Sequence, residues 1–208
     1  MKEIYEKMYR LLMDWNEKFN LTAIKTKEDF ETKHICDSMI GLPFIKGKVL
    51  DIGSGAGFPG LVIKIEKPET EVTLIDSVRK KVDYLRTAIN ELGLEGITAI
   101  HTRIEDMGGK ESFDTVTARA VAPMNVLAEY CLPFVRQGGC MVAYKSVNAE
   151  EELKEAERAI KLLGGKTEEN RIFELDEETK RRIIVIRKVK KSPDIYPRSG
   201  NKPRLKPL

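Results

Sequence analysis

The sequence of 208 residues is poor in cysteine and contains no long hydrophobic run. Its three cysteines, Cys36, Cys131 and Cys140, are odd in number and widely spaced. They match neither a disulfide framework nor the ligand spacing of a metal site, so we expect small buried side chains in a reducing, cytoplasmic compartment. No stretch approaches the run of about 18 apolar residues that spans a bilayer, and acidic residues interrupt the N-terminus where an export signal would be apolar. We therefore expect neither a membrane segment nor export.

Charged residues, in contrast, make up 33% of the chain, and they are unevenly distributed. The net charge is +3, yet the stretch from Arg187 to Leu208 holds eight basic residues against the single acid Asp194. A concentrated cationic end on a mildly acidic body is typical of proteins that bind a polyanion. A solvated, partly disordered tail explains the charge equally well, and composition alone leaves both interpretations open.

Two helices are predicted ahead of the first strand. Apolar residues spaced three or four apart over residues 4–19 indicate an amphipathic helix, and a second helix is expected over about 28–41, before Gly41 and Pro43. We interpret residues 1–46 as a helical extension packed on a core domain of residues 47–190. A basic, proline-rich tail, residues 191–208, follows and is expected to be an extended segment because its prolines interrupt helix and sheet.

From Lys48 onward, short apolar segments alternate with helical ones. Strands are predicted at 48–53, 71–76, 97–102, 113–119, 139–145, 171–175 and 181–189, and helices at 58–67, 79–92, 124–135 and 148–164. Strands alternating with helices indicate a parallel sheet covered on both faces. The short connection between the last two strands favours an antiparallel pair. The sequence thus predicts an α/β, Rossmann-like fold with a mostly parallel seven-stranded sheet whose last strand is antiparallel.

A glycine-rich loop separates the first predicted strand from its helix. Gly53, Gly55, Gly57 and Gly60 permit a tight turn and a close approach of the backbone to a ligand beside a helix N-terminus. Asp76 ends the second strand about 20 residues later, where Rossmann-like enzymes bind ribose hydroxyls. The spacing also satisfies the G-x-G-x-x-G pattern of dinucleotide-binding proteins, so the glycines alone do not identify the ligand.

The acidic residue ahead of the glycines separates the two ligand classes. Asp51 completes the pattern D-x-G-x-G-x-G. A carboxylate there would repel a pyrophosphate, but it can assist the ammonium group of S-adenosylmethionine (AdoMet), directly or through water. A purely structural role, accepting hydrogen bonds from loop amides, is compatible with either ligand. Ile104 and Glu105 follow the third strand, where methyltransferases present apolar and acidic groups to adenine. The pattern therefore favours AdoMet.

Beyond these motifs, nearly the whole chain resembles the bacterial 16S rRNA guanine-N7 methyltransferase G family, also called glucose-inhibited division protein B. The segments that carry the resemblance are WNEKFNLTAI (15–24), HICDSM (34–39), LDIGSGAGFPG (50–60), LIDSVRKKVDYL (74–85), RIED (103–106), FDTVTARAVAPM (113–124), Lys145 and YPRSGNKPRLKPL (196–208). Two departures from the family pattern are Ser146 and Thr102, where the family usually has glycine. Neither removes a side chain that the family's chemistry requires.

The resemblance implies a class I AdoMet-dependent methyltransferase that modifies N7 of a guanine in the decoding-region loop of 16S rRNA. Its partner would be that rRNA or a small-subunit ribosomal particle, and a monomer is expected. The cofactor contacts implied by the matching motifs are Gly53, Gly55, Phe58, Asp76, Ile104, Glu105 and Arg119. The residues implied to line the RNA approach are Arg103, Lys145 and Arg198.

The residue content agrees with methylation at N7, because that atom has a free lone pair and no proton to remove. The chain has no D/N-P-P-Y motif for an exocyclic amine and no cysteine placed as a nucleophile. We expect no general acid or base, with Arg119 and Lys145 positioning the target.

Structural roles are expected for His34, Asn16 and Asn20. The main alternative is an AdoMet enzyme acting on a small molecule or protein; a non-catalytic RNA-binding module and a nicotinamide oxidoreductase fit less well.

Overall fold

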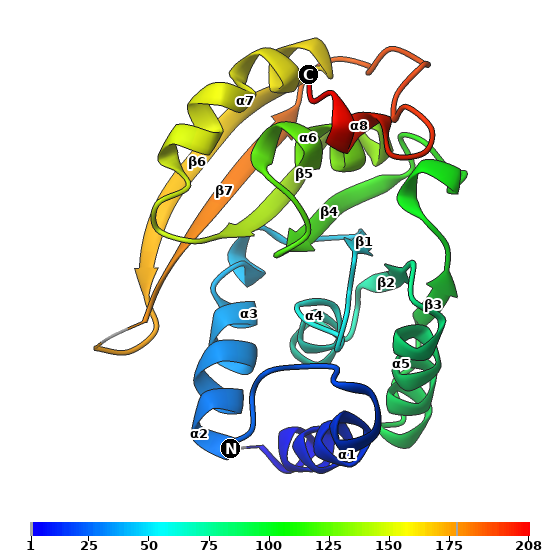
Figure 1. Ribbon diagram of the computed structural model, residues 1–208, viewed down its shortest axis with the longest axis vertical. Helices are drawn as coiled ribbons and strands as arrows, with labels where there is room; N and C mark the ends of the chain where they lie inside the picture. Colours follow the sequence, from blue (N-terminus) through cyan, green and yellow to red (C-terminus); the bar gives the residue numbers. More distant parts are fainter. Residues whose placement is uncertain (1, 178) are drawn as a thin grey trace.

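The computed structural model describes residues 2–177 and 179–208, which form a seven-stranded sheet with helices on both faces (Figure 1). The strands are β1 (Lys48–Ile52), β2 (Glu71–Asp76), β3 (Ile97–His101), β4 (Phe113–Arg119), β5 (Val135–Lys145), β6 (Gly165–Glu174) and β7 (Lys180–Lys188). Their order in the sheet is β3-β2-β1-β4-β5-β7-β6. The first five strands run parallel, and β7 is antiparallel to both β5 and β6. The predicted fold class is confirmed.

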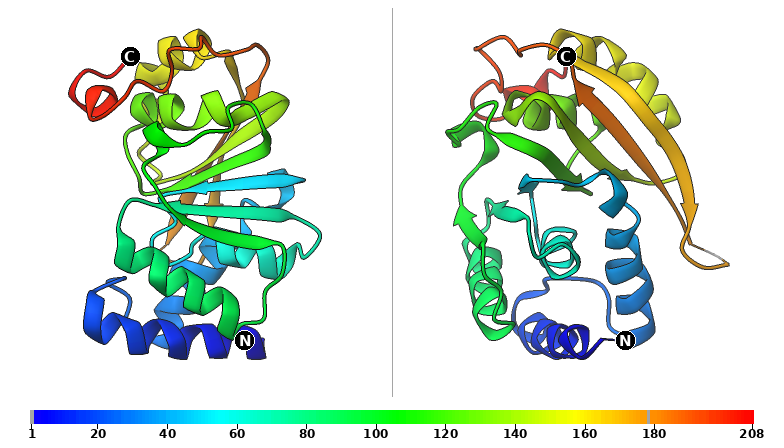
Figure 2. Two further views of the ribbon diagram at one scale, coloured as in Figure 1. Left: turned by 90° about the vertical axis from the view of Figure 1, so that its right-hand side faces the viewer. Right: turned by 180° about the vertical axis from the view of Figure 1, so that it is seen from behind.

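Helices cover the sheet in two groups (Figure 2). The main helices after β1 are α4 (Gly60–Glu66), α5 (Arg79–Glu91), α6 (Met124–Cys131) and α7 (Glu150–Leu162). Successive residues of β1 point to opposite faces: Val49 joins the hydrophobic cluster beneath α4 and α5, and Leu50 joins the one beneath α6 and α7. From Val49 to Ile52 the strand is thus buried on both sides, as is typical of a central parallel strand, and Asp51 is its one polar residue in that stretch. Within the described residues, no helix is long and apolar enough to cross a membrane.

Two strands begin earlier than predicted. β5 starts at Val135 and β6 at Gly165. The first part of β5 contains the exposed Arg136 and Gln137, and most of β6 is exposed at the sheet edge. Since neither segment shows an alternation of apolar and polar residues, the periodicity that identifies a half-buried strand is missing there.

The N-terminal extension packs on the face that holds α4 and α5. Helix α1 (Glu3–Phe19) buries Tyr5, Met8 and Leu12 in the cluster of that face. The second predicted helix is continuous from Lys27 to Met39, but it consists of α2 (Lys27–Phe30), a π-helical segment Glu31–Cys36 and α3 (Asp37–Met39). Hydrophobic periodicity does not reveal such a π segment, which often marks a functional site. The proposed domain boundaries stay a prediction.

The C-terminal tail differs from the extended segment that was expected. It folds back along α6 and contains a short helix, α8 (Lys202–Leu205). Pro203 lies in the first turn of α8, where a missing backbone N–H costs no helical hydrogen bond and the fixed φ suits the helix. The prolines therefore did not exclude a helical turn.

Replacement of Leu12 by Ala tests whether the extension is an integral part of the core. Leu12 is fully buried, so Leu12→Ala should lower the free energy of unfolding by about 2–5 kcal/mol through lost burial and a residual cavity. Lys18→Ala, an exposed position on the same helix, should change it by less than about 0.5 kcal/mol. Urea denaturation measures both. Equal, small effects would show that α1 contributes nothing to the cooperative fold.

Candidate active site

The loop between β1 and α4 is shaped by close contacts that only glycine allows. Gly53 has a φ of +67°, and a Cβ there would lie 2.8 Å from the Val121 side chain. A Cβ on Gly60 would lie 2.1 Å from Leu74. The glycine spacing that was noted in the sequence therefore has a packing reason in addition to any ligand contact.

Asp51 holds this loop from within. Its side chain is fully buried and accepts hydrogen bonds from the Gly60 amide (3.2 Å) and the Thr117 hydroxyl (2.8 Å). Burial raises the pKa of Asp51 to about 6, and the hydrogen bonds oppose that rise. Of the two roles considered for Asp51, the structure supports the one in which it satisfies loop groups.

Asp76 connects the same loop to the end of β2. One carboxylate oxygen accepts from the Gly55 amide at 3.0 Å, and the other accepts from the Val78 amide at 2.8 Å. The carboxylate also lines a cavity at the carboxyl edge of the sheet, where ligands bind in open α/β folds. Asp76 therefore has a position from which it can reach sugar hydroxyls.

This first cavity has a volume of about 240 Å³ and lies at the ends of β1, β2 and β3. Its walls include Gly53, Asp76, Ile104 and Glu105, four of the residues predicted to bind the cofactor. The Oε1 atom of Glu105 is buried without a hydrogen-bond partner among the described residues. A buried acceptor beside an apolar isoleucine suits the amino group and face of an adenine, so these residues fit AdoMet.

A second cavity, about 590 Å³ in volume, lies beside the first, and Ala120 lines both. Its walls come from residues 22–24, the π-helical segment, α3, β4, β5 and β7. Its charged residues are Lys33, Asp37, Arg119, Lys145 and Arg181. Four cations against one carboxylate make this cavity suited to an anionic or electron-rich ligand. The two cavities together offer a nucleoside site and an adjoining basic site.

His34, Phe58 and Arg119 form a stacked group at the wall of the second cavity. The rings of His34 and Phe58 stack with centroids 4.2 Å apart, and the Arg119 guanidinium carbon lies 5.3 Å from the centroid of the Phe58 ring. Arg119 donates to His34 Nδ1 at 3.2 Å, which leaves Nε2 to donate to the Thr22 hydroxyl at 2.9 Å. Burial and the Arg119 charge lower the pKa of His34 to about 3, so its ring is neutral at pH 7. The structural role expected for His34 agrees with this geometry.

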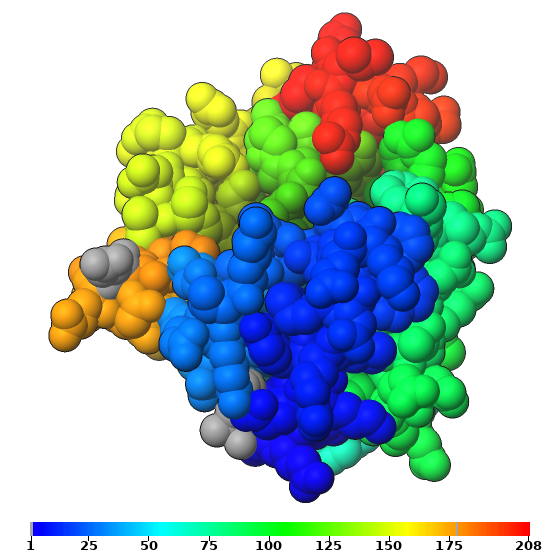
Figure 3. Space-filling model, turned by 60° about the horizontal axis from the view of Figure 1, so that its bottom comes forward, coloured from blue at the N-terminus to red at the C-terminus, as the bar shows by residue number. Residues whose placement is uncertain are grey.

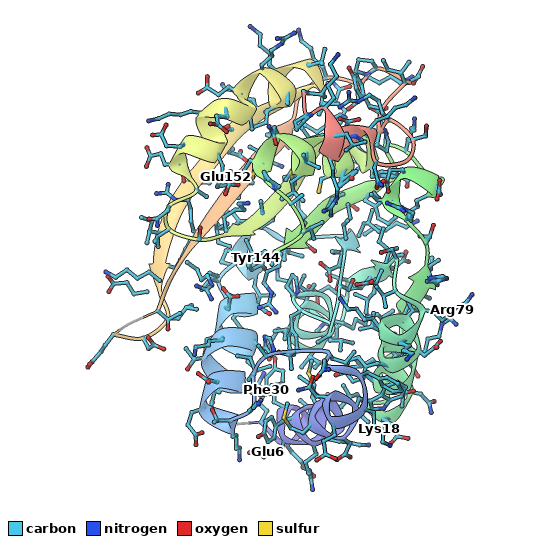
Figure 4. All side chains as sticks on the ribbon, viewed as in Figure 1. Glu6, Lys18, Phe30, Arg79, Tyr144 and Glu152 are labelled. Atoms are coloured by element: carbon cyan, nitrogen blue, oxygen red, sulfur yellow. The ribbon has the colours of Figure 1, made fainter. Side chains whose placement is uncertain are left out.

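Asp37 links the N-terminal extension to two arginines of the sheet. It is buried on α3 and lies 2.8 Å from Arg119 and 3.3 Å from Arg181. Tyr144, which lies between β5 and α3 in Figure 4, donates to the Ser38 carbonyl at 3.0 Å. The extension is thereby attached to the carboxyl ends of β4 and β5, where the second cavity lies.

The predicted cofactor residues are only partly gathered around the first cavity. Gly55 and Phe58 do not line this cavity: the Gly55 amide donates to Asp76, and Phe58 is buried. Arg119 lines the second cavity instead. The cofactor contacts of these three residues stay a prediction. Asn16 and Asn20 have structural positions: Asn16 accepts from the Thr22 amide, and Asn20 ends α1 in the left-handed conformation.

The three predicted RNA residues occupy different places. Arg103 is half-exposed at the rim of the first cavity, and Lys145 lines the second, paired with Glu152 at 2.6 Å. Arg198 instead makes a bidentate ion pair with the fully buried Glu129 at 2.6 and 2.9 Å. Its guanidinium is committed to the protein interior, which gives Arg198 an anchoring role; its RNA contact stays a prediction.

Sequence reasoning did not single out some of the residues that line these cavities. Among them are Asp37 and Arg181 in the second cavity and Arg204 in the first. Asp37 and Arg204 lie in segments that carried the family resemblance, HICDSM and the terminal stretch, so a signal was available for them. Arg181 is one of several basic residues in a strand and has no distinguishing pattern.

The chain matches the family model described as rRNA small subunit methyltransferase G over residues 1–192. The curated ribosomal RNA small subunit methyltransferase G of Exiguobacterium sibiricum is 46% identical over 213 residues, which cover 98% of this chain and 90% of the relative. The protein of the same name from Lactococcus lactis is 43% identical over 217 residues, covering 99% and 90%. The similarity therefore spans the extension, the sheet and both cavities.

Solved structures extend the likeness at the level of the fold. M. jannaschii TYW2, solved in complex with AdoMet, is similar with a TM-score of 0.60 at 14% sequence identity. The alignment covers 79% of this chain and 77% of that one. At this identity the match concerns the fold alone.

The lowered pKa of His34 predicts a specific pH dependence of stability. A histidine with an unfolded pKa of 6.5 and a folded pKa of about 3 contributes stability above pH 6.5, and this contribution is lost as the pH falls toward 3. Between pH 7 and pH 5, the wild-type free energy of unfolding should therefore fall by about 2 kcal/mol more than that of His34→Asn.

Urea titrations at both pH values, carried out on both proteins, measure this difference. The opposite contribution of Asp51, whose pKa is raised, is present in both proteins and cancels. Parallel curves for the two proteins would show that His34 is accessible to protonation in the folded state.

Proposed function

Because the chain belongs to the rRNA small subunit methyltransferase G family, we propose that it transfers a methyl group from AdoMet to N7 of guanine 527 in 16S rRNA. The observation that carries this proposal is the junction of the two cavities at Ala120. A nucleoside-shaped site thereby adjoins a basic site large enough for a base that has left its stack. We place the reaction in the cytoplasm, where ribosomal subunits are assembled.

The first cavity is proposed to hold AdoMet. Asp76 would bind the ribose hydroxyls, and Ile104 and Glu105 would contact the adenine. When bound, AdoMet supplies an electrophilic methyl group on a sulfonium sulfur. The backbone at Gly53 can approach the ligand closely because it carries no side chain.

The second cavity is proposed to receive the guanine. N7 of guanine is a free acceptor, so the protein needs to align it and exclude water rather than remove a proton. This requirement agrees with the residues present: Asp37 is the cavity's carboxylate and is already paired with Arg119 and Arg181. An arginine can donate to O6 beside N7, and Arg119 is placed at the junction with the first cavity.

The rim of the two cavities is proposed to bind the RNA backbone. Lys33, Lys145, Arg181 and Arg103 bring positive charge to this region from four separate segments. Phosphate contacts of this kind orient a nucleic acid without reading its sequence, and they weaken with added salt. Recognition of a particular guanine would then come from the shape of the cavity and of the RNA loop. The proposed substrate is 16S rRNA, either free or in a small-subunit ribosomal particle.

The product of the reaction tests the proposal directly. When the purified protein is added, rRNA from cells that lack it should accept a labelled methyl group from AdoMet. Nucleoside mass spectrometry should identify the labelled product as 7-methylguanosine. Asp76→Ala, which removes the predicted ribose contact, should abolish incorporation. Label in another nucleoside would contradict the chemistry, and label only in a small molecule or protein would favour the alternative substrate class.

Lys145 should contribute to RNA binding and not to cofactor binding. Lys145→Met keeps the aliphatic length but removes the charge, so kcat/KM for rRNA should fall on the order of 10-fold to 100-fold while the Kd for AdoMet stays unchanged. Lys154→Met, at an exposed position on α7, is the matched control and should retain activity. Filter binding at several salt concentrations and calorimetry measure the two affinities. A weakened AdoMet affinity would place Lys145 in the cofactor site instead.

A further inference from the structure

Residues 193–208 of the C-terminal tail lie beyond the residues matched by the family model. Figure 3 shows it, in red, on the same face as the N-terminal segment in blue. Its charge and proline content predicted an extended segment, whereas in the structure it makes specific contacts with the rest of the protein. Two anchors fix its course, and its last helix reaches the first cavity.

The first anchor lies where the tail leaves the sheet. Lys188, at the end of β7, is almost completely buried and donates to the Leu132 carbonyl at 2.6 Å and to the Ser192 hydroxyl. Ser192 in turn donates to the Leu163 carbonyl at 2.6 Å. This chain of hydrogen bonds directs the tail across the ends of α6 and α7.

The second anchor is the ion pair between Arg198 and Glu129 of α6. Glu129 has no exposed surface, and its two carboxylate oxygens accept three hydrogen bonds from Arg198: one from the backbone amide and two from the guanidinium. The Arg198 guanidinium also donates to the Lys206 carbonyl at 2.9 Å. A buried carboxylate needs such partners, so this contact fixes both ends of the turn that contains α8.

Between these contacts the tail forms part of the first cavity. Arg204 lines the cavity together with Tyr130, Ile104 and Glu105, and it donates to the Val121 carbonyl at 3.2 Å. Asn201 accepts from Arg103, another residue of the wall, at 2.9 Å. The tail therefore contacts the cavity at the end where Ile104 and Glu105 are expected to bind adenine.

We propose that the tail is a component of the cofactor site, in which Arg204 contacts the adenosyl part of AdoMet and Arg198 with Glu129 positions Arg204. This inference rests on the proposed function, since it assumes that AdoMet occupies the first cavity. A planar guanidinium can stack on a purine or donate to its ring nitrogens, which are acceptors. At least one basic residue of the tail then contacts the cofactor, so RNA is not the only binding partner of the tail.

Calorimetric titration of the full chain tests the contact. Arg204→Ala should weaken binding of AdoMet on the order of 10-fold, which corresponds to one lost charge-assisted contact. It should weaken binding of methylthioadenosine, which lacks the amino-acid part, by the same factor. Lys202→Ala removes an exposed charge from the same short helix and is the matched control, with unchanged affinity for both compounds. Because Arg204 is itself exposed, thermal unfolding without ligand should be the same for all three proteins.

The positioning role is tested through Arg198. Arg198→Lys keeps the charge near Glu129 but cannot reproduce the bidentate geometry, so it should weaken AdoMet binding in the same direction as Arg204→Ala. Adding Arg198→Lys to Arg204→Ala should then cause little further loss, because the two residues act on one contact. Additive losses would overturn the coupling between Arg198 and Arg204.

Two other results would overturn the inference. Unchanged AdoMet affinity in Arg204→Ala, with equal loss of RNA affinity in Arg204→Ala and Lys202→Ala, would show that the tail binds RNA alone. An effect on AdoMet that is absent for methylthioadenosine would move Arg204 away from the adenosyl part. The titrations measure binding of AdoMet, methylthioadenosine and RNA, so their outcome does not depend on whether rRNA is methylated. Failure of the proposed function would appear instead as AdoMet binding by the wild type without 7-methylguanosine formation.

Discussion

The buried carboxylate of Asp51 is the constraint on which the rest of the site depends. It joins three elements at one point, because it lies on β1, accepts from Thr117 on β4 and accepts from the first amide of α4. The glycine loop can therefore take only the course that brings Gly53 against Val121 and Gly55 within reach of Asp76. Contacts within the protein thus set the course of the loop that lines the first cavity.

A buried carboxylate also fixes each of the two terminal segments of the chain. Asp37 attaches the N-terminal extension to Arg119 and Arg181, and Glu129 attaches the tail to Arg198. Burying a charge is unfavourable unless it is paired, so each carboxylate makes its partner's position nearly obligatory. A reaction at guanine N7 requires no general base, which leaves these carboxylates free to serve structure. The acidic groups hold the segments together, and basic groups line the two cavities.

The sequence predicted what depends on local patterns and not what depends on distant contacts. The period of the apolar residues located the buried strands, and the glycine spacing together with Asp76 located the first cavity. The exposed strand β6 has no such period, and its true start at Gly165 was not predicted. Arg198 shows a second limit of prediction from local sequence. A basic residue in a cationic tail predicts a contact with RNA, but its ion-pair partner Glu129 is 69 residues away, and nothing in the local sequence connects the two. The cofactor contact of Phe58 stays a prediction from its motif, and the stacking of its ring on His34 of the extension is a distant contact that the local sequence does not reveal.

The ion pairs of the second cavity divide its basic residues into two kinds. Lys145 pairs with Glu152, and Lys33 pairs with Asp29; in both pairs the carboxylate is about as exposed as an ordinary surface group. The Lys33 pair is exposed on both sides and contributes about 1 kcal/mol or less, so a phosphate can replace its carboxylate at little cost. The Lys145 side chain is only 12% exposed, so this figure does not apply to its pair, but Glu152 is 36% exposed and would not be left as a buried charge if a phosphate replaced it. The pair of Arg119 with Asp37 is different, because the Asp37 side chain is only 3% exposed and would be left as an unpaired buried charge. Arg119 would therefore keep its place if RNA bound, whereas the two lysines could exchange partners. A fixed arginine at the junction of the cavities and lysines whose carboxylate partners are solvent-exposed would suit an enzyme that must align one base accurately while accepting an irregular RNA backbone.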